Sequence, residues 1–373
     1  MPANPRRGSR PRKRPASRSS ERRRRIRERF DTQVDRERRR YSGQAWRLLV
    51  RELRDRFLER YLPQGHGWVL ELGPGPGRFT PTILSSGARV VAVDLSLPML
   101  RALGRRKPIR SRSTRLRRVR AAGEHLPFQD GTFRAAIALG NILGFSASDG
   151  ARLLSELARV TRPGGLLILD VASPVAATTD FLESAARTRL LRRVLRDPSY
   201  YFLNQVAASS DRTHQPYAPK RWGFFEFDFY TPAGAEEALV AAGFRPVDRM
   251  ALGAVGAYRE RLTTIARREP RVWRNLLELE ERVGRRSGVL ETGHGFVVAA
   301  VRERRSPRTR PQARPALEHN LGGERGCVPR ERGFVPSLQG NPIRFCHISS
   351  GERVKKRAAS SRLVGRVLSL FGV

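Results

Sequence analysis

The chain has 373 residues and a formal net charge of +38, with an isoelectric point near 11.7. Only five of its 73 basic residues are lysine, so the charge either suits a polyanionic partner such as nucleic acid or an acidic membrane, or simply reflects a GC-rich coding sequence. Its two cysteines, Cys327 and Cys346, exclude a disulfide framework and a cysteine zinc cluster, and no apolar run approaches the roughly 20 residues of a membrane span.

Two basic arms flank the part of the chain that can build a core. Residues 1–40 and 303–373 are rich in Arg and Pro and have no sustained hydrophobic period, so both are predicted to be disordered, with at most a fraying helix over 21–40. The N-terminus lacks the apolar segment of a secretory signal, and we therefore expect a cytoplasmic protein. One globular domain is predicted over residues 41–302.

Between the arms, helices and strands alternate. The amphipathic spacing of residues 45–61 predicts a helix that Pro63 and Gly65 end. Strands are then expected at 68–72, 89–93, 116–121, 135–139 and 166–171, with helices starting near 79 and covering 97–103 and 148–160. Strands separated by helices of this length predict an α/β fold with a parallel sheet and right-handed crossovers.

A glycine-rich loop follows the first of these strands, in the stretch VLELGPGPGRFT at residues 69–80. Glycine is used where φ must be positive or where a ligand comes close to the main chain. The G-x-G-x-G spacing of Gly73, Gly75 and Gly77 is neither the G-x-G-x-x-G of a dinucleotide fold nor a P-loop. A buried strand that enters such a turn predicts a nucleotide-binding loop, without naming the ligand.

Polar residues follow the carboxyl ends of the predicted strands, where open α/β sheets bind their ligands. Glu71 can accept a hydrogen bond from an ammonium group. Asp94 lies about 20 residues after the glycines, where an acid can bind ribose hydroxyls or cap the next helix. Glu124 follows the third strand, and Gly140 and Asn141 follow the fourth, where Asn141 can equally satisfy a turn.

Four stretches in this order resemble the class I S-adenosylmethionine-dependent methyltransferases, in particular the methyltransferase type 11 group: VLELGPGPGRFT, VVAVDLSLPML, GEHLPFQDGTFRAAIALGNILGF and LARVTRPGGLLILDV. Residues 230–249 resemble the last helix and sixth strand of that fold, and residues 295–303 its closing strand. The resemblance implies a Rossmann-like, doubly wound, mostly parallel seven-stranded sheet with an antiparallel last strand. It also implies S-adenosylmethionine as the cofactor and in-line transfer of its methyl group to a small-molecule acceptor.

The resemblance assigns roles to the positions that match the family's cofactor site. The glycine loop would pass under the methionine part of the cofactor, Glu71 would lie near its amino group, and Asp94 would take both ribose hydroxyls. Leu95, Gly123 and Glu124 would contact the adenine, and the loop after the fourth strand would lie by the methyl group. The full set is Glu71, Gly73, Gly75, Gly77, Asp94, Leu95, Gly123, Glu124, Gly140 and Asn141.

The chain departs from the family pattern at two positions. Ala122 stands where many relatives carry an acid that meets the adenine amino group, so the backbone or Glu124 would have to hold the adenine. Arg134 stands where an acid usually follows the Phe of the fourth strand.

Residues 172–232 form an insert where relatives build a substrate lid. In 221–230, three phenylalanines alternate with polar residues and Tyr230, which predicts a strand whose one face packs while the other lines a pocket; core packing explains the phenylalanines equally well. No metal site is expected. The candidates for a catalytic base are His214, Tyr201, Tyr217 and Glu226.

Three functions fit these observations. We expect a small-molecule methyltransferase first, an RNA or protein methyltransferase that docks nucleic acid or protein through the basic arms second, and a non-catalytic scaffold third. Steep salt dependence would mark the second, and absence of cofactor binding the third. Because the matched cofactor positions all lie within 68–171, the arms are expected to be dispensable for cofactor binding.

Overall fold

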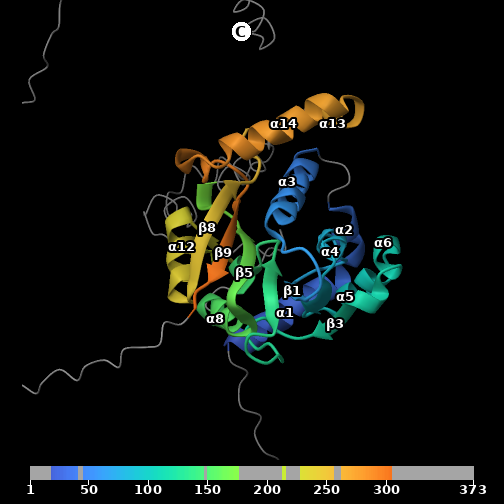
Figure 1. The fold of residues 1–373 in the computed structure, drawn as a ribbon, viewed down its shortest axis with the longest axis vertical. Helices are drawn as coiled ribbons and strands as arrows, with labels where there is room; N and C mark the ends of the chain where they lie inside the picture. The colour runs from blue at the N-terminus through green and yellow to red at the C-terminus, as the bar shows by residue number, and fades with distance from the viewer. Residues whose placement is uncertain are drawn as a thin grey trace, which may run out of the picture. The chain divides into compact units, whose positions relative to one another are not determined.

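A computed structural model describes residues 18–40, 45–146, 149–175, 212–215, 227–255 and 262–304. Its centre is a seven-stranded sheet that crosses Figure 1 from β3 on the right to β8 on the left, in the order β3-β2-β1-β4-β5-β9-β8. The strands are β1 (Trp68–Leu72), β2 (Arg89–Asp94), β3 (Leu116–Arg120), β4 (Phe133–Ala138), β5 (Thr161–Val171), β8 (Phe244–Ala251) and β9 (Phe296–Arg302).

The strand directions match the expected topology. β1 pairs in parallel with β2 and β4, β2 with β3, and β4 with β5. β9 pairs antiparallel with both β5 and β8. The doubly wound, mostly parallel sheet with an antiparallel last strand is therefore confirmed, and the carboxyl ends of the first five strands share one edge.

Helices cover both faces of this sheet. Successive strand residues point to opposite faces, so Val69 packs in a core with α3 (Ala45–Tyr61) and α14 (Pro270–Val283), whereas Leu70 packs in a second core with α8 (Gly150–Val160) and α12 (Pro232–Ala241). The other helices here are α4 (Thr80–Ser85), α5 (Leu97–Gly104), α6 (Lys107–Arg110), α7 (Ile142–Ser146) and α13 (Leu262–Arg268).

Residues 18–40 of the N-terminal arm are mostly helical, as the helix allowed over 21–40 anticipated, but they dock on the core, so the prediction of disorder is wrong for this part of the arm. Helices α1 (Arg18–Thr32) and α2 (Val34–Arg39) contact α5. Ile26, Phe30 and Val34 recur at a spacing of four and form a narrow apolar stripe, in which Ile26 is only 7% exposed. The many arginines between them obscure this pattern in the sequence. The predicted disorder of residues 1–17 and of the tail beyond 304 concerns residues outside the described part of the chain.

Little of the insert at 172–232 lies within the described residues. A hairpin of β6 (Arg212–Gln215) and β7 (Phe227–Tyr230) forms a separate two-stranded sheet, so the strand predicted over 221–230 is confirmed for its last four residues. The predicted division into a packed and a pocket-lining face is wrong there, because Asp228, Phe229 and Tyr230 are all buried.

Arg134 explains one departure from the family pattern. Its guanidinium lies against the turn that precedes β1 and donates to four backbone carbonyls: Nη2 to Pro63 O at 2.8 Å and Gly65 O at 2.5 Å, and Nη1 to Gln64 O at 3.0 Å and His66 O at 3.3 Å. Burial lowers the pKa of this arginine. An acid at this position could not donate to carbonyls, so the arginine has a structural role at the amino end of the sheet, opposite the expected site.

The first prediction concerns this turn. Arg134→Met removes all four donated bonds, and because water can reach the exposed turn, we expect the free energy of unfolding to fall by about 1–3 kcal/mol in urea titrations. Arg245→Met is the control, since Arg245 is exposed in β8 and its side chain makes no hydrogen bond or ion pair with any described residue. Equal stability of the two variants would contradict a stabilising role for the four hydrogen bonds that Arg134 donates.

Candidate active site

The three glycines after β1 are required for two different reasons. All have positive φ, at +66° for Gly73, +55° for Gly75 and +79° for Gly77. A Cβ on Gly73 would lie 2.3 Å from Ile142 Cδ1 and one on Gly77 would lie 2.8 Å from Ile109 Cδ1, whereas one on Gly75 would meet nothing within 4 Å. All three positions need positive φ. Side chains at Gly73 and Gly77 would also have to displace the tips of Ile142 and Ile109, whereas Gly75 presents its bare backbone to open space.

The carboxylate of Asp94 ties this loop to the end of β2. Its Oδ2 accepts from Gly75 N at 3.1 Å and its Oδ1 from Ser96 N at 2.9 Å. The side chain that caps α5 belongs to Ser96, whose Oγ accepts from Met99 N at 3.3 Å, so the alternative of Asp94 as the cap is wrong. Burial raises the pKa of Asp94 to about 6, and Leu95 beside it is half-buried.

Glu71 is the more deeply buried acid of the same edge. It is 3% exposed, and its Oε2 accepts from Thr80 Oγ1 at 2.7 Å. Burial raises its pKa to about 7, only partly opposed by the Thr80 bond and the positive charge of Arg106. A carboxylate with so little compensation is suited to receive a cation or a hydrogen-bond donor.

The loop after β4 is held by a buried acid that sequence reasoning missed. Asp170 Oδ1, at the end of β5, accepts from Gly140 N at 2.6 Å and Asn141 N at 3.0 Å, and Oδ2 forms an ion pair with Arg54 of α3. Asn141 is the one non-glycine residue of the described chain with positive φ, at +60°, and its Oδ1 accepts from Ala172 N at 3.1 Å. The side chain of Asn141 thus has the structural role that the turn alternative predicted, while its backbone lies at the expected place.

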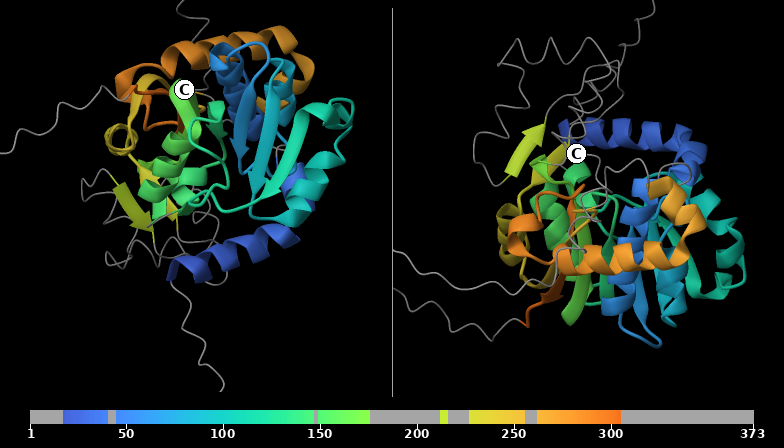
Figure 2. Two further views of the ribbon diagram at one scale, coloured as in Figure 1. Left: turned by 60° about the horizontal axis from the view of Figure 1, so that its bottom comes forward. Right: turned by 90° about the horizontal axis from the view of Figure 1, so that it is seen from above.

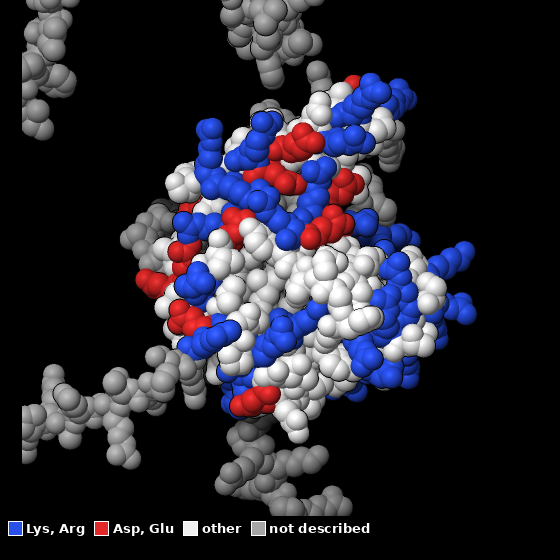
Figure 3. All heavy atoms as spheres, viewed as in Figure 1, with Lys and Arg blue, Asp and Glu red and all other residues white. Residues whose placement is uncertain are grey.

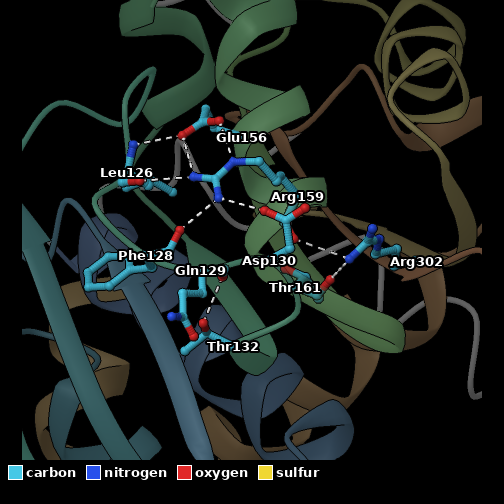
Figure 4. A network of polar contacts seen from close by, with 9 residues as sticks. All are labelled: Leu126, Phe128, Gln129, Asp130, Thr132, Glu156, Arg159, Thr161 and Arg302. Atoms are coloured by element: carbon cyan, nitrogen blue, oxygen red, sulfur yellow. Dashed lines mark hydrogen bonds and ion pairs between the residues drawn. The ribbon is translucent and has the colours of Figure 1, made fainter.

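The loop after β3 carries Gly123 and the buried Glu124, and Arg159 of α8 fixes the chain just beyond them (Figure 4). Arg159 pairs with Glu156 at 2.7 Å and Asp130 at 2.9 Å and donates to the carbonyl oxygens of Leu126 and Phe128. Figure 4 shows these groups converging on one guanidinium. The network holds the loop as it leaves the candidate site.

The structure thus brings the ten predicted cofactor positions to one edge of the sheet, at the ends of β1 to β4. The predicted bases are not among them. His214 lies in β6 in register with Asp228, and Tyr201, Tyr217 and Glu226 lie outside the described residues. Within the described ranges, His, Cys, Asp and Glu side chains form no group of three that could hold a metal, and no helix is long and apolar enough to cross a membrane.

Known proteins match parts of this chain in sequence. The family described as "Methyltransferase domain" matches residues 70–169. A demethylmenaquinone methyltransferase of Mycobacterium marinum is 32% identical over 188 residues, which cover 48% of this chain and 75% of that protein. The enzyme of the same name from Corynebacterium urealyticum is 40% identical over 111 residues, 29% of this chain and 43% of that protein.

A solved structure is similar at lower identity. The 1,6-didemethyltoxoflavin-N1-methyltransferase of Burkholderia thailandensis, with bound 1,6-didemethyltoxoflavin and S-adenosylhomocysteine, aligns at 18% identity and a TM-score of 0.49, over 78% of this chain and 93% of that one. The sequence match to three quarters of the mycobacterial protein, together with the family match over β1 to β5, identifies the chain. It belongs to the class I S-adenosylmethionine-dependent methyltransferases.

Proposed function

We propose that the ten positions at the carboxyl edge hold S-adenosylmethionine, as the family resemblance implies. The observation that supports this most is Asp94, whose two oxygens are aimed by the Gly75 and Ser96 amides and are not used to cap α5. Each oxygen keeps a lone pair for a ribose hydroxyl. Glu71 would receive the amino group, the open backbone at Gly75 would lie along the methionine part, and Leu95, Gly123 and Glu124 would contact the adenine.

The residues of the edge bind and orient, and the bound cofactor supplies an electrophilic methyl group on a sulfonium for in-line displacement. Asp170 and Arg54 would act indirectly. They fix the backbone of Gly140 and Asn141, and this backbone would lie by the methyl group. A base is needed only where the acceptor must lose a proton. His214, Tyr201, Tyr217 and Glu226 remain the predictions for that role.

The acceptor we propose is a small, planar, quinone-like molecule, and the proposal draws on the names of the relatives, which are demethylmenaquinone methyltransferases. It would bind beside the loop after β4, where β7 contacts α7. We also expect the reaction in the cytoplasm.

The basic surface does not favour an RNA acceptor. Figure 3 shows basic side chains gathered on the right, over α6 and β3, while acidic and basic side chains interleave at the top, over α3 and α14. Residues 95–123 hold ten basic residues and no acid. They also hold no aromatic residue on which a base could stack. This surface therefore offers an RNA chain positive charge without a platform for base stacking.

Methyl transfer with labelled cofactor tests the acceptor class. The full chain should label demethylmenaquinone and leave RNA and protein pools unlabelled, at a rate that salt changes little. Label in RNA or protein alone would contradict the proposal, as would a rate that falls steeply with salt.

The glycine loop gives a matched pair of variants. Gly75 and Gly243 both have positive φ, and a Cβ on either meets nothing within 4 Å. Alanine at either position should therefore lower the free energy of unfolding by a similar amount, about 1–2 kcal/mol. Only Gly75→Ala should weaken binding of S-adenosylhomocysteine, by roughly 10-fold or more, because its methyl group would stand between ligand and backbone. Equal calorimetric affinities for the two variants would contradict the placement of the ligand.

Glu71 makes cofactor affinity depend on pH. Ligand binding needs the ionised forms of Glu71 and Asp94, whose pKa values in the free protein are about 7 and about 6. Affinity for S-adenosylhomocysteine should therefore rise roughly 10- to 100-fold between pH about 5.5 and 7.5, and Glu71→Gln should flatten the rise. Identical pH profiles of affinity for both proteins would contradict this role.

The effect of Glu71 on folding stability runs the other way with pH. Because its pKa is raised on folding, its contribution to the free energy of unfolding is present below pH about 4.5 and is lost as pH rises through about 7.

A further inference from the structure

Helices α1 and α2 lie over the edge of the sheet that carries the candidate cofactor site. Figure 2 shows α1, in blue, lying across the ends of the strands in both views. Phe30 contacts the ring of Phe145 in α7, with ring centroids 5.8 Å apart, and Arg23 pairs with Asp149 at 3.6 Å. The segments that α1 reaches, α5, α7 and the start of α8, all follow strands at their carboxyl ends.

The glycine loop itself is bonded to α2. Arg78, the residue after Gly77, donates from Nη2 to Glu37 O at 2.8 Å and pairs with the Glu37 carboxylate at 3.6 Å. Glu37 is 9% exposed, so this is a docked contact of buried groups. The two helices are therefore attached both to the loop after β1 and to the segments after β2 and β4.

The packed side of the arm includes apolar and acidic groups, and several of its arginines are exposed to solvent. Ile26, Phe30 and Glu37 lie on the packed side. The exposed residues of the two helices include Arg24, Arg25, Arg36, Arg38 and Arg39.

Among the acids of the two helices, Asp31 in the last turn of α1 is the one whose surroundings point to a ligand. Its Oδ1 is buried and accepts no hydrogen bond from any residue of the described chain. Helix α1 contacts α5, the helix that follows Asp94, and the Asp31 charge adds to burial in raising the pKa of Asp94. A buried acceptor without a donor costs free energy unless a partner arrives, and because Asp94 would take both ribose hydroxyls, the adenine amino group is the adenosine donor left for Asp31.

We propose that α1 and α2 form a cap that completes the cofactor site, with Asp31 as a second carboxylate beside Asp94 at the adenosine end. This rests on the proposed cofactor edge and reverses the expectation that the N-terminal arm is dispensable for cofactor binding. Asp31 supplies an acid from another part of the chain, while Ala122 stands where relatives have one. The cap must move for the cofactor to exchange, because it is docked on the segments that surround the site.

A matched pair of acid-to-amide substitutions on one helix tests the binding role. Asp31→Asn in the full chain should weaken S-adenosylhomocysteine binding in calorimetry by roughly 10-fold, as expected for loss of one charge-assisted hydrogen bond. Glu28→Gln, on the exposed face of α1 where Glu28 pairs only with Arg24 at 3.4 Å, should leave the affinity unchanged. Equal affinities of the two variants would overturn the assignment of Asp31.

Hydrogen exchange on the unchanged protein tests the cap without any substitution. S-adenosylhomocysteine should slow amide exchange in α1 and α2 as well as in the glycine loop. Protection of the loop with unchanged exchange in α1 and α2 would overturn the cap while leaving the cofactor site intact. If the unchanged protein does not bind the ligand at all, the proposed cofactor edge fails and the cap falls with it.

Discussion

Buried negative charge at one edge of the sheet is the constraint on which the site depends. Glu71, Asp94 and Asp170 each stand at or near the carboxyl end of a parallel strand. Glu71 and Asp170 are buried and Asp94 is partly buried, and taking a carboxylate out of water is costly unless donors or cations compensate it. The three are compensated unequally. Asp170 has two amides and an arginine, Asp94 has two amides, and Glu71 has one hydroxyl and a more distant arginine charge.

The difference in hydrogen bonding and ion pairing among these carboxylates separates structural from ligand-binding acids. The well-compensated Asp170 organises its surroundings, because its bonds to Gly140 and Asn141 hold a positive-φ asparagine in place and its pair with Arg54 joins α3 to β5. The less compensated Glu71 and Asp94 have raised pKa values, which is the expected state of groups that gain a partner when a donor-rich cation binds. The same sheet edge thus supplies both a rigid scaffold and unmet acceptors.

The sequence predicted those parts of the structure that local patterns encode. Apolar runs, glycines and acids at strand ends located β1 to β5 and the glycine loop. The Arg54–Asp170 pair was not predictable in the same way, because its members are 116 residues apart and only the packing of α3 against the sheet joins them. Asp170 did carry a signal, as an acid at the end of an apolar strand.

The N-terminal helices show a different limit of sequence reasoning. The arginine content of residues 18–40 outweighs an apolar stripe of three residues, so composition predicted disorder where the chain docks. Helix α14 was missed as well, although Trp273 and Leu277 mark its buried face at a spacing of four. Arg134 looked like a departure from a family motif, and only the four carbonyls around it reveal its role.

Calorimetric titration of Asp94→Ala with S-adenosylhomocysteine tests the central claim most directly. If Asp94 accepts both ribose hydroxyls, the variant should lose about 2–4 kcal/mol of binding free energy, roughly 30- to 1000-fold in affinity, while urea unfolding shows that it remains folded. Binding as tight as that of the unchanged protein would contradict the account, because the edge would then hold its ligand without the acid around which its loops are arranged.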